Sequence, residues 1–163
     1  MEDKTASSPN PSPLLWMILA ILACGVLATL AYKLWPLLYP EVTEVAALDT
    51  GCDLRLSPCE VGFRDGGRVL LDIRPAGIPP ATPLQLHVLV RGIEAESVEV
   101  DFAGVDMYMG FNRVALVEER PGHYQGSGMI PVCVRDRMTW EARVLLQTPR
   151  GLLAAPFRFD TVR

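Results

Sequence analysis

Two methionines and two aromatic residues share one short segment, Asp106–Arg113, which reads DMYMGFNR. Met107 and Met109 carry thioethers, and thioether and thiolate sulfurs are soft ligands that suit Cu(I). Two further side chains of matching chemistry follow downstream, the imidazole of His123 and the thiol of Cys133. These four residues form a candidate copper site, with copper as its cofactor.

Two other interpretations of the same segment stay open. Methionine side chains fill irregular gaps beneath loops, so the segment can also close a hydrophobic core. Apolar residues on a strand connection can instead mark a surface that contacts another protein. On that interpretation the contact residues are Met107, Tyr108, Met109 and Phe111.

Cys52 and Cys59 lie seven positions apart in GCDLRLSPC. Half-cystines at this spacing can close a small loop across a hairpin mouth, given a Cα separation of about 5.5 Å. A zinc-type site would need a second Cys or His pair at fixed spacing, and none follows. The spacing favours a structural disulfide, with free thiols or a thiol redox pair as alternatives. Cys133 is either a free thiol or a partner of one of these two, because connectivity does not follow from spacing.

Catalytic motifs are missing from the sequence. It has no glycine-rich phosphate loop, no nucleophile elbow and no His-Glu-x-x-His. The two histidines, His87 and His123, have no Asp or Ser at motif spacing. His87 falls on the polar face of an alternating strand, where we expect it to be solvated. The sequence therefore favours a protein that is not an enzyme.

An uncharged, apolar stretch runs from Leu14 to Tyr32 and determines where in the cell the rest of the chain is held. Crossing a hydrocarbon core of about 30 Å takes roughly 20 helical residues, and lipid forces such a segment to satisfy its own hydrogen bonds. Trp16 and Trp35 stand near its two ends, where aromatic rings favour the headgroup layer. We expect a transmembrane helix over residues 14–35 after a disordered tail over 1–13. A cleaved signal peptide and a lipoprotein signal are the alternatives.

The rest of the chain is expected to form a linker over residues 36–50 and a β domain over 51–163. Asp65-Gly66-Gly67 separates two β-rich runs, 60–64 and 68–74, which is a hairpin signal. Period-2 alternation and turn residues predict six further strands, over 84–90, 98–102, 113–118, 124–134, 139–147 and 152–160. The predicted fold class is all-β, an antiparallel β-sandwich of immunoglobulin-like architecture tethered by one N-terminal transmembrane helix. Trp140 is its expected large core aromatic.

Charge restricts the class of partner. The net charge of −4 and the pI of about 5.2 argue against nucleic acid, which requires a basic surface. One basic residue stands near each membrane face, Lys4 and Lys33, so charge does not set the orientation. A disulfide would, because it forms outside the cytoplasm.

The short tail, the single anchor helix and the small all-β domain with the segment Asp106–Arg113 resemble the FixH and YtkA-like membrane proteins. Those proteins are implicated in assembling copper-containing respiratory oxidases or in handling copper. The resemblance implies a bacterial inner-membrane protein with a cytoplasmic N-terminus, a periplasmic domain and a larger membrane complex as partner. Phe111 and Asn112 stand where the related segment often carries a histidine. The resemblance therefore implies a location and an assembly role more than a metal ligand.

Three functions remain in view. The first is a non-enzymatic accessory or assembly protein that contacts its partner through the segment Asp106–Arg113, which we call the methionine segment. The second is a copper-binding chaperone that uses Met107 and Met109. The third is a thiol redox protein that uses Cys52 and Cys59.

Overall fold

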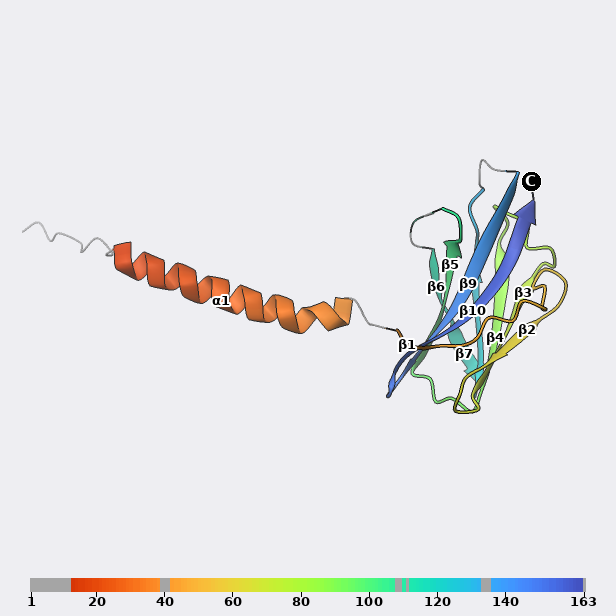
Figure 1. Ribbon diagram of the computed structural model, residues 1–163, viewed down its shortest axis with the longest axis horizontal. Helices are drawn as coiled ribbons and strands as arrows, with labels where there is room; N and C mark the ends of the chain where they lie inside the picture. Colours follow the sequence, from red (N-terminus) through yellow and green to blue (C-terminus); the bar gives the residue numbers. More distant parts are fainter. Residues whose placement is uncertain (1–12, 39–41, 108–109, 111, 133–135, 163) are drawn as a thin grey trace, which may run out of the picture. The chain divides into compact units, whose positions relative to one another are not determined.

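The computed structural model describes residues 13–38, 42–107, 110, 112–132 and 136–162. The chain divides into two compact units, 1–40 and 41–163, and each is described here by itself (Figure 1). Helix α1 spans Pro13–Leu38. Proline suits the first turn of a helix, because an N–H at that position would have no acceptor within the helix. Residues 13–34 are long and apolar enough to cross a membrane, a property that a signal sequence shares. The helix extends three residues beyond its expected end at residue 35.

The described part of the second unit contains ten strands in two five-stranded sheets (Figure 1). The first sheet has the order β1-β10-β9-β5-β6, and the second has the order β2-β3-β4-β8-β7. All neighbouring strands are antiparallel except β1 and β10, which are parallel. The strands are β1 Val42–Val45, β2 Cys59–Gly62, β3 Arg68–Arg74, β4 Leu84–Arg91, β5 Ser97–Gly104, β6 Arg113–Ala115, β7 Val117–Arg120, β8 His123–Gly128, β9 Arg137–Thr148 and β10 Gly151–Val162.

Alternation along the strands builds one hydrophobic core, to which both sheets contribute. In β4 every second side chain from Leu84 to Val90 is buried, while the polar residues between them face outward. The core takes Leu86 from the second sheet and Val100 from the first. Trp140 is fully buried, and its Nε1 donates a hydrogen bond of 3.1 Å to Oγ1 of Thr161. The mostly β domain and the core position of Trp140 are therefore confirmed.

The prediction of a single strand over residues 113–118 is wrong, because the structure has two strands there, β6 and β7. β6 belongs to the first sheet and β7 to the second, and the chain passes between the sheets at Leu116. The amide of Leu116 donates a hydrogen bond of 2.9 Å to the carbonyl oxygen of Val98. Alternation alone does not reveal such a transfer, since both halves read as strand.

Two glycines of β8 make room for this crossing segment. A Cβ on Gly128 would lie 2.8 Å from Cγ2 of Val114, and one on Gly126 would lie 2.6 Å from Cδ2 of Leu116. Glycine within a strand is typical of such a close approach. The expected strand over residues 124–134 also stops early, because β8 ends at Gly128.

The expected linker over residues 36–50 is corrected at β1. This four-residue strand pairs with the start of β10, and Ala46 continues the contact by donating a hydrogen bond of 2.8 Å to the carbonyl oxygen of Ala154. Ala46 is also buried in the core. β1 escaped notice because a short edge strand has few alternating positions and its parallel partner lies far away in the sequence.

Candidate functional site

The described residues of the methionine segment Asp106–Arg113 lie at one end of the domain, where β5 ends at Gly104 and β6 begins at Arg113 (Figure 1). At that end Gly104 pairs with Trp140, near the start of β9. Val42, by contrast, pairs with Leu152 beside the β9–β10 turn. Leu152 is in turn opposite Gln147, so the two places are seven residues apart along β9, or about 24 Å at about 3.4 Å per residue. The segment therefore lies at the end of the domain opposite to β1, through which the chain arrives from the helix.

Three hydrogen bonds attach this connection to the framework. The amide of Val105 donates to the carbonyl oxygen of Thr139 at 3.0 Å. The amide of Phe102 donates to the carbonyl oxygen of Asn112 at 2.9 Å, and Nδ2 of Asn112 donates to the carbonyl oxygen of Met129 at 2.8 Å. The β5–β6 connection is thus tied both to β9 and to the segment that follows β8.

Met107 is half-buried and packs against the core. This placement agrees with methionine as a filler of gaps beneath loops. Tyr108, Met109, Phe111 and Cys133, which the sequence also nominates, lie outside the described residues. Met107 is therefore the one methionine of the candidate copper set whose place the structure gives.

Three exposed apolar side chains lie on the two connections that meet at this end, one on the β5–β6 connection with Met107 and two on the β8–β9 connection. Val105 is 43% exposed, Met129 52% and Val132 58%. We call Val105, Met107, Met129 and Val132 the Met107 rim. Exposed apolar side chains brought together on loops are typical of protein-contact surfaces. Val105 and Val132 were missed in the sequence because isolated valines between strands carry no motif.

The connection between β3 and β4 is hydrogen-bonded to the segment that carries Met129 of the rim. The amide of Ala81 donates a hydrogen bond of 2.9 Å to the carbonyl oxygen of Ile130, which is fully buried next to Met129. Ile78 in the same connection is fully buried with φ of 48°, an unusual backbone conformation for a β-branched residue. Burial of this side chain offsets the backbone cost.

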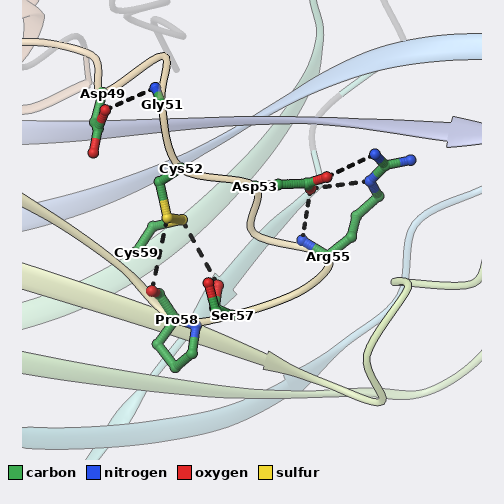
Figure 2. Close-up of a disulfide and its surroundings, with 8 residues drawn as sticks. All are labelled: Asp49, Gly51, Cys52, Asp53, Arg55, Ser57, Pro58 and Cys59. Carbon is green, nitrogen blue, oxygen red and sulfur yellow. Dashed lines mark hydrogen bonds and ion pairs between the residues drawn. A yellow bond between two sulfur atoms is a disulfide. The ribbon is translucent and has the colours of Figure 1, made fainter.

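Cys52 and Cys59 form a disulfide with a Cα separation of 5.8 Å (Figure 2). Their sulfur atoms lie 3.7 Å from the carbonyl oxygens of Pro58 and Ser57. Because disulfide sulfurs carry no hydrogen, these are van der Waals contacts. Cys59 is only 3% exposed, which suits a structural bond better than a reactive thiol. The free cysteine among the described residues is Cys24, in α1.

An ion pair lies inside the loop that this disulfide closes, the segment 52–59 (Figure 2). Nη2 of Arg55 donates to Oδ2 of Asp53 at 2.7 Å, and Nε and the backbone amide both donate to Oδ1 at 3.0 Å. The hydrogen bonds from the Arg55 side chain lower the pKa of Asp53. The disulfide therefore closes the ends of the loop, and the ion pair between Asp53 and Arg55 fixes its conformation between them.

A second carboxylate is held beside the methionine end. Oδ1 of Asp160 accepts a hydrogen bond of 2.7 Å from the hydroxyl of Thr139, and Oδ2 accepts from the guanidinium of Arg137. Hydrogen bonds from Arg137, then from Thr139, lower the pKa of Asp160. This contact joins the start of β9 to the end of β10.

His123 does not join Met107. It begins β8 and pairs with Leu89, whereas Gly128 at the other end of β8 leads to the Met107 rim. The described members of the predicted copper set are thus not brought together. Among the residues that the structure describes, no group of three or more His, Cys, Asp or Glu side chains could hold a metal ion.

His123 instead shares a pocket with His87, on the outer face of the second sheet. The pocket has a volume of about 260 Å³. It is lined by Pro58, Leu70, Asp72, His87, Val88, Leu89, Glu119, Arg120, His123, Tyr124 and Gln125. The sequence places His87 on a polar face correctly, but strand periodicity does not say that β4 lies beside β8.

Comparison with protein-family models, with curated proteins and with solved structures finds no match to this chain. Function must therefore be inferred from the chain's own residues.

Proposed function

We propose that the chain is a membrane-anchored, non-enzymatic accessory protein that acts by protein contact in the assembly of a larger membrane complex of the respiratory oxidase type. Helix α1 serves as its uncleaved anchor in a bacterial inner membrane, with the N-terminus in the cytoplasm. The apolar character of residues 13–34 supports the anchor. The bond between Cys52 and Cys59 supports a periplasmic domain, because disulfides persist in oxidising compartments.

We further infer that the two sheets form a β-sandwich of the immunoglobulin-like kind. Support comes from the shared core, to which Leu86 and Trp140 contribute from opposite sheets, and from the antiparallel pairing within each sheet. Such a scaffold carries its connecting loops at its two ends, where they are free to contact other molecules.

The observation that carries the proposal is the Met107 rim. Val105, Met129 and Val132 are exposed and Met107 is half-buried, yet the backbone is fixed, because Val105 is hydrogen-bonded to β9 and Asn112 is hydrogen-bonded to Met129. A surface whose backbone is already fixed loses less conformational entropy when it binds a partner. The rim also lies at the end of the domain opposite to β1, so a partner can approach it without displacing the connection to the anchor.

The two rival functions have less support in the described residues. A copper chaperone needs soft or imidazole ligands to converge, and Met107 lies at the opposite end of β8 from His123. A thiol redox protein needs an accessible, reactive cysteine, and of this bonded pair Cys59 is buried and Cys52 is half-buried. Protein contact requires neither.

Paired substitutions in the native host test the proposal. Changing Met107 and Met109 to Leu keeps the apolar volume and removes both thioethers, whereas changing both to Ser removes the apolar surface as well. We expect the Leu variant to retain complex assembly and the Ser variant to lose much of it, measured as oxidase activity and as assembled complex on native gels.

The same variants separate the alternatives. Failure of the Leu variant alongside the Ser variant would favour copper, because both lack thioethers. If both variants match the wild type in assembly and activity, Met107 only closes the core and the proposed contact surface is wrong.

A further inference from the structure

We propose that His87 and His123 form a two-histidine binding site for a divalent transition-metal ion of the Zn²⁺ type. This site is separate from the Met107 rim and does not depend on the proposed assembly function. The chain contains two histidines in all, and both line the same pocket although they come from strands far apart in the sequence. Imidazole nitrogen is the commonest protein ligand for such ions.

The strand register brings the two imidazole rings close enough to bind the same ion. Across β4 and β8, His87 is opposite Gln125 and His123 is opposite Leu89. The histidines are therefore diagonal neighbours on one face of an antiparallel pair, with Cα atoms about 7–8 Å apart. Zn–N bonds of about 2.0–2.1 Å from two imidazoles can bridge such a separation.

Both imidazoles are free to bind. Within the described part of the chain, the side chains of His87 and His123 make no hydrogen bond or ion pair. An unused imidazole in a hollow retains the nitrogen lone pair that a metal ion requires.

Carboxylates border the same pocket. Asp72 is opposite His87 across β3 and β4, and it also accepts a hydrogen bond of 3.0 Å from Nε of Arg74. Glu119 lines the pocket and accepts a hydrogen bond from the amide of Gln125. Arg120 also lines the pocket and Asp72 is paired with Arg74, so the carboxylate charges are compensated and the two imidazoles carry the proposal. Because the described residues include no ready group of three ligands, water fills the remaining coordination positions.

The size of the pocket agrees with an ion better than with an organic ligand. Its volume of about 260 Å³ is below the range of about 300–1,000 Å³ that is typical of small-molecule sites. A hydrated ion held by two imidazoles needs only part of this space. Leu70 and Leu89, both half-buried, form its apolar flank, and the pocket is open to solvent at His87, which is exposed.

The test uses the full chain in detergent micelles, purified without a polyhistidine tag. Zn²⁺ is titrated by calorimetry, and Cu²⁺ serves as a spectroscopic probe whose paramagnetic resonance spectrum counts bound nitrogens. We expect one ion per chain and coupling to two nitrogens. His87→Asn and His123→Asn should each weaken Zn²⁺ binding by about tenfold or more. Ser127→Ala, on the same face of β8 but outside the pocket lining, should bind as the wild type does.

Thermal melting of each variant checks that the domain stays folded, which is expected because both histidines lie outside the core. Coupling to a single nitrogen, or binding that survives the double substitution, would mean an adventitious ion only and would overturn the proposal. Absence of saturable Zn²⁺ binding by the wild type would overturn it equally.

Discussion

The backbone amide of Gly77 donates a hydrogen bond of 2.9 Å to the carbonyl oxygen of Arg55. Arg55 lies inside the disulfide loop, and Gly77 lies in the β3–β4 connection, whose Ala81 amide donates a hydrogen bond to the carbonyl oxygen of Ile130. Ile130 directly follows Met129 of the Met107 rim. The β3–β4 connection is therefore hydrogen-bonded both to the disulfide loop and to Ile130 beside the rim. We expect reduction of the disulfide to change the conformation of the rim.

Replacing Cys52 and Cys59 together by Ala should lower the free energy of unfolding by about 2–3 kcal/mol, because the open chain regains loop entropy. We expect hydrogen exchange at the Gly77 amide to accelerate more than at the Glu96 amide, which bonds to Gln147 at 2.7 Å at the other end of the domain. Amide exchange followed by NMR measures both. Equal acceleration at the two amides would show that the disulfide affects only global unfolding.

The corrected domain boundary predicts how fragments behave. A fragment over residues 41–163 should unfold cooperatively without the helix, since it keeps β1 and the whole core. A fragment over 51–163 lacks β1 and Ala46, so it exposes the edge of β10 and should melt at a lower temperature. Circular dichroism on heating compares the two. Identical melting temperatures would mean that β1 adds nothing to stability.

Thr161 tests the polar contact in the core. Thr161→Val removes the hydroxyl that accepts the Trp140 Nε1 hydrogen bond and leaves a buried donor without a partner. We expect a loss of about 1–3 kcal/mol in chemical denaturation. Thr161→Ser keeps the hydroxyl and should lose less. If Ser is the more damaging change, the lost methyl group matters more than the hydrogen bond.

Acid should weaken the contact between Asp160 and its donors. Hydrogen bonds from Arg137 and Thr139 lower the pKa of Asp160 in the folded state. A lowered folded pKa stabilises the domain above the unfolded value of about 3.9, and this contribution disappears as pH falls through the folded pKa. Asp160→Asn should therefore reduce the drop in unfolding free energy below about pH 4. The expected change is within about 1 kcal/mol, since the pair is partly exposed. Denaturation at pH 7 and pH 3 measures it, and an unchanged drop would contradict it.

Local patterns predicted the elements whose signals are contained within a few residues. The hairpin around Gly66 and the buried face of β4 follow from turn chemistry and alternation, and both are present. The transfer between sheets at Leu116 and the parallel partner of β1 depend on which distant strands pair. Periodicity carries no such information, so these features could not be predicted.

The candidate site divides in the same way. The sequence drew attention to Met107 by residue type, and the structure adds Val105 and Val132, which lie at the same end. The sequence grouped His123 with Met107 by ligand chemistry. The structure groups His123 with His87 instead, because β8 pairs with β4 and points the histidine to the outer face.

The central claim is that the Met107 rim contacts a partner protein in the membrane. A photo-crosslinking amino acid placed at Val105 in the full chain, in native membranes, tests it most directly. The matched control places the same amino acid at Arg150, which is exposed in the β9–β10 turn at the other end of the domain. We predict a discrete adduct with a subunit of a membrane complex from position 105 and none from position 150. Adducts from position 150 alone, or from neither position, would contradict the account.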